Sequence, residues 1–317
     1  MSGHQSIEWK SLEDKRSYNY LLRQLATLTA NTGAKRKGFE NDPGFKVILD
    51  APSLEVGHDV AEIIDEGEST AMDIRERLME AGWALLEAHV DRSGHAICSI
   101  QAKSPVGNQD HKSSIKFKTL KNVVLKVAIF VEETGWNRDE NLVPLGKLNN
   151  ILKEWGGIQV RHKGMRVFPY GDPEDDWLEI DRDRGRRLGR APDELQNFVE
   201  TLRSHTPRLD PGRVLLNSLS AKAFLGGVDI GEGQVGLLQR ADRKGFVRKA
   251  TFEELKHFTR YCINWAMIWR DFAVKERERA KATKFRVELE RAQGGKSISK
   301  GEQGEFALKA LRSGIKQ

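Results

Sequence analysis

The sequence lacks any apolar run approaching the ~20 residues that a membrane-spanning helix needs. Residues 1–10 also lack the apolar segment of a secretory signal peptide. Only two cysteines occur, Cys98 and Cys262, each within an apolar stretch. We therefore expect buried thiols, not a disulfide or a metal site. The eight histidines show no metal-ligand spacing. These features predict a cytoplasmic protein without a bound metal.

Complete catalytic and nucleotide-binding motifs are missing as well. There is no Gly-x-Ser-x-Gly elbow and no His-Glu-x-x-His pair. Residues 295–297 read Gly-Lys-Ser, like the end of a phosphate-binding loop, but Glu290 stands where that loop needs a glycine. We therefore expect no enzymatic activity from this chain alone.

One acidic cluster leaves a hydrolase open as an unfavoured alternative, because paired carboxylates can cleave glycosidic bonds. Arginines 182, 184, 186, 187 and 190 are interleaved with its end, so an ion-paired, solvated turn is the favoured interpretation. The cluster consists of Asp172, Glu174, Asp175, Asp176, Glu179, Asp181 and Asp183.

The net charge of +6 is unevenly distributed along the chain. Residues 273–317 contain twelve Lys and Arg against six Asp and Glu, so the first 272 residues are neutral on balance. Nucleic-acid binding needs clustered positive charge on one face. The sequence therefore favours the C-terminal arm, not the folded body, as a weak polyanion-binding element.

Hydrophobic patterning predicts a β-rich body between flanking helices. The predicted strands are 7–9, 45–49, 83–90, 95–100, 114–120, 123–132, 158–162, 165–168 and 222–230, with 123–132 at the centre of a sheet. The predicted helices are 18–28, some of 51–82, 145–155 and 193–204.

The last predicted helix starts near Phe252 and carries a continuous apolar seam to Phe272. Glu276 and Arg279 occupy the next two seam positions, so we expect packing to stop near Phe272. Helical composition continues to about Ala292, which predicts a helix of roughly 60 Å whose second half projects free.

Three segments resemble one family. Residues 164–181 read GMRVFPYGDPEDDWLEID, residues 223–230 read AFLGGVDI, and residues 239–255 read QRADRKGFVRKATFEEL. Together they resemble the transducer domain of bacterial GHKL ATPases, the group that contains DNA gyrase B, heat-shock chaperone and MutL-type proteins. Residues 3–12, GHQSIEWKSL, resemble the terminal strand of the ATPase domain in that family.

The resemblance implies an α+β fold: a mixed sheet with helices on one face, like that of small ribosomal subunit protein five, followed by a projecting C-terminal helix. It implies four segments, namely residues 1–12 as the end of an otherwise absent ATPase domain, 13–272 as transducer, 273–292 as projecting charged helix and 293–317 as flexible basic tail. Residues 191–217 look like an insertion.

The resemblance also implies a function, namely coupling of ATP binding and hydrolysis in a neighbouring domain to a conformational change. It makes Arg243 the candidate γ-phosphate contact and Lys244 a second cofactor-binding candidate, although an acidic residue is common at the latter position. ATP with Mg would bind only when an ATPase domain is supplied by the same protein or a partner chain. A homodimer is a further expectation.

The alternative to the transducer function is a stand-alone interaction module that uses the basic arm for nucleic acid or protein. In that case Arg243 is an ordinary surface arginine, which composition alone favours. An ATPase-domain reading frame directly upstream would favour the transducer.

Overall fold

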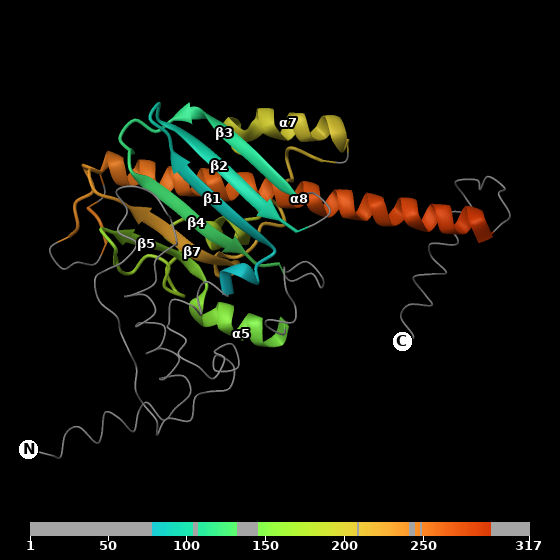
Figure 1. The fold of residues 1–317 in the computed structure, drawn as a ribbon, viewed down its shortest axis with the longest axis horizontal. Coiled ribbons are helices and arrows are strands. Elements are labelled where there is room, and N and C mark those ends of the chain that lie inside the picture. Colours follow the sequence, from blue (N-terminus) through green and yellow to red (C-terminus); the bar gives the residue numbers. More distant parts are fainter. Residues whose placement is uncertain are drawn as a thin grey trace, which may run out of the picture.

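The computed structural model describes residues 78–103, 107–131, 145–207, 209–240, 245–247 and 249–292. Within these residues the chain has an α+β fold, a mixed seven-stranded sheet with a long C-terminal helix (Figure 1). The elements predicted at 7–9, 18–28 and 45–49 lie outside the described residues, as do most of 51–82, the segment 1–12 and the tail 293–317.

The sheet has the strand order β3-β2-β1-β4-β7-β5-β6. The strands are β1 Ala84–Val90, β2 His95–Ala102, β3 Asn108–Lys116, β4 Val123–Ile129, β5 Gly157–His162, β6 Met165–Arg166 and β7 Phe224–Ile230. Neighbours are antiparallel except β5 and β7, which run parallel, so the sheet is mixed.

Strand β4 lies fourth of the seven strands, which confirms the central position predicted for 123–132. Six of its seven residues are buried, because both faces of a central strand are covered. The hairpins predicted around residues 91–94 and 163–164 are also present, as β1–β2 and β5–β6.

The strand predicted at 114–120 was wrong in its position, because the strand is Asn108–Lys116. The prediction followed the apolar residues Ile115 and Phe117. The strand is instead mostly polar, and it lies at the edge of the sheet, where one ladder with β2 is enough to hold it.

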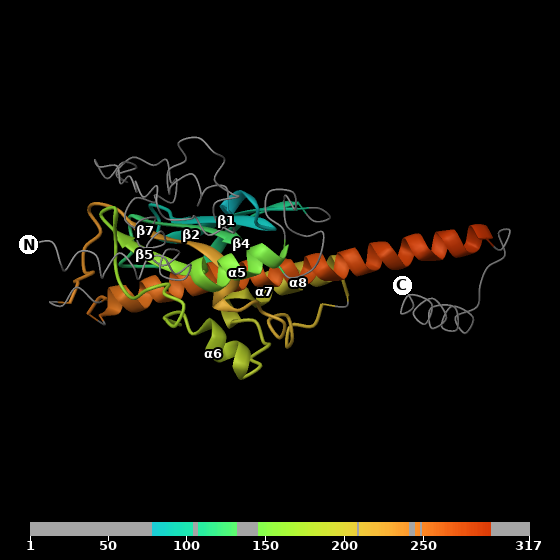
Figure 2. The same cartoon turned by 90° about the horizontal axis from the view of Figure 1, so that it is seen from below.

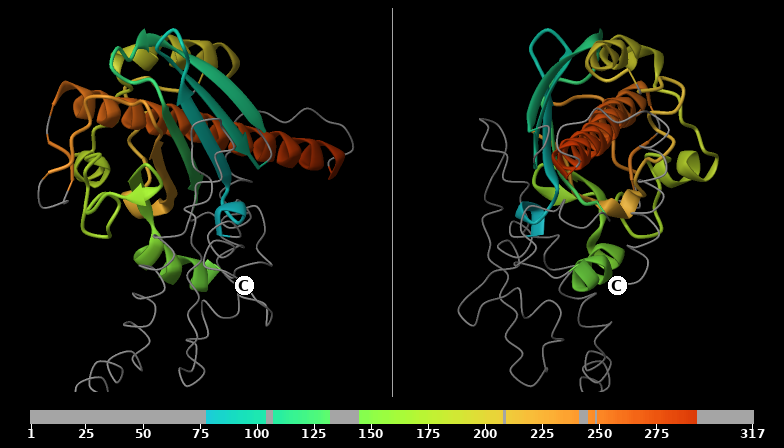
Figure 3. Two further views of the ribbon diagram at one scale, coloured as in Figure 1. Left: turned by 60° about the vertical axis from the view of Figure 1, so that its left-hand side comes forward. Right: turned by 90° about the vertical axis from the view of Figure 1, so that its right-hand side faces the viewer.

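The helices are α5 Leu145–Trp155, α6 Ile180–Gly185, α7 Gln196–His205 and α8 Ala250–Ala292, with 3-10 turns η1 Asp193–Leu195 and η2 Ala221–Ala223. The predicted helices 145–155 and 193–204 are thus confirmed, the latter with a 3-10 first turn. Helices α7 and α8 lie on the same side of the sheet (Figure 3).

Helix α8 crosses that side of the sheet and extends well beyond it (Figure 2). Leu255, Phe258, Cys262 and Trp265 are fully buried and belong to one core with the inner faces of the strands. From Glu278 to Glu288 every residue of α8 is exposed. The structure therefore shows a packed half and a projecting half.

Packing against α8 continues one turn past the predicted limit at Phe272. Ala273 is buried, Thr206 donates a hydrogen bond to Glu276, and Arg279 donates to the His205 carbonyl at 3.2 Å. The C-terminal turn of α7 supplies these contacts, so polar pairs continue a seam that is no longer apolar.

The two cysteines are free and fully buried, as predicted. Cys98 lies on β2 and Cys262 on α8, and their sulfur atoms are 3.5 Å apart. Burial raises the pKa of the Cys262 thiol well above its ordinary value. Both residues thus act as small apolar groups between sheet and helix.

Candidate functional site

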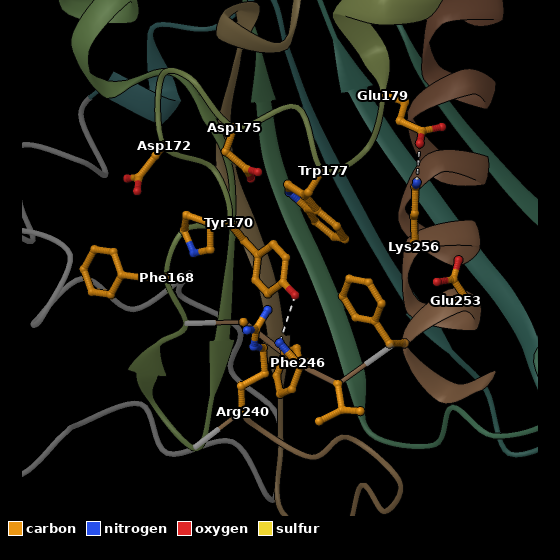
Figure 4. Close-up of a pocket in the computed structure, with 14 residues that line it drawn as sticks. Phe168, Tyr170, Asp172, Asp175, Trp177, Glu179, Arg240, Phe246, Glu253 and Lys256 are labelled. Atoms are coloured by element: carbon orange, nitrogen blue, oxygen red, sulfur yellow. Dashed lines mark hydrogen bonds and ion pairs between the residues drawn. The ribbon is translucent and has the colours of Figure 1, made fainter. Parts of the chain in front are cut away.

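An open cleft of about 1110 Å³ lies where the segment after β6 meets the segment before α8 (Figure 4). Its lining comes from residues 168–179, residues 240–247 and the first two turns of α8. The first two sets belong to the two longest segments that carry the family resemblance. Some 70 positions apart in the chain, they contact each other directly in the fold.

The loop of residues 240–245 is closed at its base by backbone hydrogen bonds. Gln239 and Phe246 form an isolated antiparallel bridge. The Arg240 amide donates to the Gly245 carbonyl at 3.0 Å, and the Val247 amide donates to the Leu238 carbonyl at 2.8 Å. The two ends of the loop are therefore held together like the ends of a hairpin.

Tyr170 fixes this loop base to the body of the protein. Its hydroxyl accepts a hydrogen bond from the Phe246 amide at 3.0 Å, and its ring stacks on the Phe246 ring with centroids 6.0 Å apart. Gly245 has φ +84°, and a Cβ there would lie 2.9 Å from the Tyr170 hydroxyl. A glycine is thus required both for the turn and for the close approach.

Aromatic rings continue from Tyr170 to helix α8. The Tyr170 ring lies 5.2 Å from that of Trp177 and 5.5 Å from that of Phe252, which is in the first turn of α8. The Trp177 indole nitrogen donates to the Ile158 carbonyl on β5 at 2.9 Å. The loop base, the sheet and the start of α8 are therefore joined through one cluster.

The two predicted site residues, Arg243 and Lys244, lie outside the described residues. The structure describes the residues on either side, Arg240 and Gly245. Arg240 projects from the loop into the cleft (Figure 4). The accessibility expected for Arg243 therefore stays a prediction.

The acidic cluster is used mainly for local structure, in agreement with the favoured interpretation. Asp172 pairs with Arg166 at 2.5 Å, and Asp183 pairs with Arg260 at 2.8 Å. Asp176 accepts hydrogen bonds from backbone amides in the first turn of α6. Glu179 pairs with Lys256 at 2.9 Å, which holds the pKa of that carboxyl below its usual value.

Asp175 is the exception, because its pKa is raised. Burial in the cleft is the main cause, and the nearby Asp172 and Asp176 add to it, while the hydrogen bond from the Gly171 amide opposes it. A raised carboxyl pKa in a cleft is typical of functional sites, but structural carboxylates show it too. Among the described residues no group of three or more His, Cys, Asp or Glu is arranged to hold a metal ion.

Exposed apolar side chains gather around the loop base, a feature that sequence reasoning missed. Val235, Leu238 and Val247 are 70%, 52% and 39% exposed, and Met165 on the adjoining hairpin is 69% exposed. Leu238 and Val247 are joined by their backbones, while Met165 pairs with His162, whose ring contacts Phe246. We call these four residues the apolar rim.

No protein-family model matches the chain, and a search of curated proteins found no match either. No described helix has an apolar stretch that would allow it to cross a bilayer. Functional inference therefore rests on the residues and their geometry.

The Tyr170 hydroxyl is expected to control the mobility of the loop. In Tyr170→Phe, the buried Phe246 amide loses its acceptor, which costs about 1–3 kcal/mol of unfolding free energy. Trypsin should then cut the loop, which contains Arg243 and Lys244, at least several times faster than in the unchanged protein.

Tyr261→Phe is the matched control, since it removes another partly buried hydroxyl, bonded to His111 at 2.6 Å and remote from the loop. It should lower stability without changing cleavage at the loop. Equal cleavage rates in both variants would show that Tyr170 does not hold the loop.

Proposed function

We propose that this chain is the transducer module of a GHKL-type ATPase, with the fold of small ribosomal subunit protein five. It couples the ATP state of a neighbouring ATPase domain to movement of the arm formed by α8. The observation that carries the proposal is the attachment of the 240–245 loop to Tyr170. This contact joins the two segments that most closely resemble the family.

Arg243 lies inside this loop and is the residue that we assign to the γ-phosphate. A guanidinium keeps its charge at all physiological pH values and offers a planar fork of donors to phosphate oxygens. Bound ATP and Mg would supply the reacting phosphate from the ATPase domain. A loop fixed at its base can deliver the arginine without a large entropy cost, because its two ends are already ordered.

The aromatic cluster provides a path from the loop to the arm. Phe246 at the loop base and Phe252 in α8 lie 6.1 Å apart between ring centroids, and both contact Tyr170. Helix α8 has 43 residues and is therefore about 65 Å long. A shift of the loop on phosphate release would be passed to the start of this helix and amplified at its far end.

The apolar rim supports docking of a protein domain at this place. Exposed apolar groups that gather in one area mark interaction surfaces more often than scattered ones do. We assign the rim around the loop to the ATPase domain, because the loop can reach a nucleotide only if that domain lies against it.

The experiment uses this chain and the ATPase domain encoded upstream of it or in one reading frame with it. The chain alone is expected to hydrolyse no ATP above a blank. The ATPase domain with the chain should turn over about 10²-fold faster than the ATPase domain alone, the usual worth of one preorganised charge contact. A native gene neighbourhood without an ATPase-domain frame, or an ATPase unaffected by the chain, would contradict the proposal.

A second candidate, a stand-alone binding module, is favoured by one observation. Phe285 and Val287 on the projecting half of α8 are 41% and 39% exposed, among exposed basic residues (Figure 1). Such a helix face suits a partner helix or a polyanion. Retention of all partners after removal of residues 280–317 would speak against this alternative.

A further inference from the structure

The fold gathers positive charge at one end of the sheet, although the sequence of the body is neutral on balance. The β1–β2 turn, the β3–β4 connection, the β5–β6 turn and the β7–α8 loop all lie at this end (left in Figure 1). The exposed basic residues there are Arg92, Lys116, Lys118, Lys121, Lys163, Arg240 and Lys249.

A hollow of about 890 Å³ forms the β1–β4 half of this end. It is open to solvent between the β1–β2 turn and the β3–β4 connection. Four basic residues line it: Arg92, Lys116, Lys118 and Lys121. None of these four side chains forms an ion pair with another described residue, so their charges stay available. We call this hollow the basic cleft.

The carboxylates near the basic cleft are directed inward to backbone amides. Asp91 accepts hydrogen bonds from the Ser93 hydroxyl at 2.6 Å, from the Ser93 amide and from the His95 amide, and it pairs with Lys112 at 3.0 Å. These contacts, chiefly with Ser93, hold the pKa of Asp91 far below its usual range. Its negative charge is thus occupied within the turn.

Glu254 on α8 is used in the same way. It accepts hydrogen bonds from the amides of Lys118 and Thr119 at 3.1 and 2.7 Å and from the Thr119 hydroxyl at 2.7 Å. Burial opposes its ionisation, but the bonds from Thr119 and Lys118 outweigh it and lower the pKa. The β3–β4 connection is therefore held at a fixed place on α8 while its lysines face outward.

We propose that the basic cleft binds the phosphodiester backbone of a nucleic acid. The inference goes beyond the proposed transducer function and does not depend on it. Lysines and an arginine on fixed loops supply the sequence-independent contacts that such backbones require. Protein interfaces, in contrast, are depleted in lysine and enriched in apolar anchors, which here lie in the separate apolar rim.

The dimensions agree with a backbone ligand. From β2 to β5 the sheet has four strand spacings, which place Lys163 about 20 Å from the β1–β2 turn. Nucleic-acid duplexes carry one phosphate per ~3.4 Å of axis on each strand, so a strip of this length faces about six phosphates of one strand. The cleft supplies the near end of that strip and Lys163 the far end.

The test compares two triple charge reversals in the full chain. The cleft variant is Lys116→Glu, Lys118→Glu, Lys121→Glu. The control is Arg184→Glu, Arg186→Glu, Arg187→Glu, which changes net charge equally at exposed positions in and after α6. Binding is followed by fluorescence anisotropy with duplex DNA, duplex RNA and single-stranded DNA of about 20 nucleotides, from about 50 to 200 mM salt.

We expect the cleft variant to bind at least about tenfold more weakly at low salt. Its slope of log affinity against log salt should fall by about three, one for each lysine lost. The control should bind like the unchanged chain. The three ligands tell which nucleic acid the cleft prefers, because phosphate geometry differs among them.

Two variants guard against other causes. Lys116→Gln, Lys118→Gln, Lys121→Gln removes the contacts without adding repulsion and should show most of the loss, with an unchanged thermal midpoint. A chain ending at Glu288 lacks six Lys and Arg against three Glu and reports the contribution of the tail. Equal loss in both charge-reversed variants, or loss only on removing the tail, would overturn the proposal. So would a cleft variant that binds nucleic acid normally but no longer stimulates the ATPase domain, which would assign the cleft to an acidic protein.

Discussion

Replacing Arg243 by alanine is expected to lower ATP turnover of the assembled ATPase by about 10²–10³-fold, while leaving the stability of this chain within about 0.5 kcal/mol. The loss is large because a charge aimed at the γ-phosphate stabilises the transition state in a site that excludes water. The small stability effect follows from the expected exposure of the loop. Turnover and chemical unfolding of the same preparation measure the two effects.

Arg243→Lys separates charge from geometry. Lysine keeps the positive charge but lacks the planar fork, so it should restore only some of the turnover. Lys244→Ala and Arg240→Ala are the neighbouring controls and should cost far less. Normal turnover in Arg243→Ala would contradict the assignment of that residue. A large loss in one of the controls would move the contact to that neighbour.

Much of the fold could be predicted because its signals are local. The apolar run at 123–132 predicted a central strand, and β4 is central. The three- and four-residue spacing from Phe252 predicted the long helix α8. Each signal reflects burial of one element against a continuous core, which hydrophobic periodicity records directly.

The missed elements depend on partners elsewhere in the chain. Strand β3 is polar along most of its length and exists because β2 offers a free edge. The contact of Thr206 with Glu276 joins positions 70 residues apart, and no local pattern announces it. Such elements are determined by tertiary context more than by their own sequence.

The candidate sites show the same limit. The resemblance of residues 164–181 and 239–255 to one family suggested related roles, but not that the Tyr170 hydroxyl would meet the Phe246 amide. Charge is a second case. The body is neutral in sequence order, yet the topology gathers basic loops at one end while carboxylates such as Asp91 and Glu254 are consumed by backbone amides.

Gly171 connects the Pro-Tyr-Gly segment to the sheet, and its replacement is expected to have the largest effect on stability. Its φ is +77°, and a Cβ there would lie 2.7 Å from backbone atoms of Ile158 and Gln159 on β5. On the other side, a Cβ on Gly157 would lie 2.6 Å from the Gly171 carbonyl. The two backbones therefore approach each other at a distance that only glycines permit.

Gly171→Ala should lower the unfolding free energy by about 2–5 kcal/mol. About 1–2 kcal/mol comes from the left-handed backbone conformation, and the rest comes from overlap with atoms of β5 that cannot move aside. Because Tyr170 is the adjacent residue, the change should also free the loop at 240–245 for trypsin cleavage. Urea unfolding and cleavage rates measure the two consequences.

Gly164→Ala is the matched control, because Gly164 has nearly the same φ, +76°, and a Cβ there would meet nothing within 4 Å. It carries the conformational cost alone, about 1–2 kcal/mol, and should leave the loop protected. The difference between the two variants therefore measures the close approach of the Pro-Tyr-Gly segment to β5. If Gly171→Ala costs no more than Gly164→Ala, that segment is not held against the sheet as the structure places it. The attachment of the loop through Tyr170 would then lose its foundation.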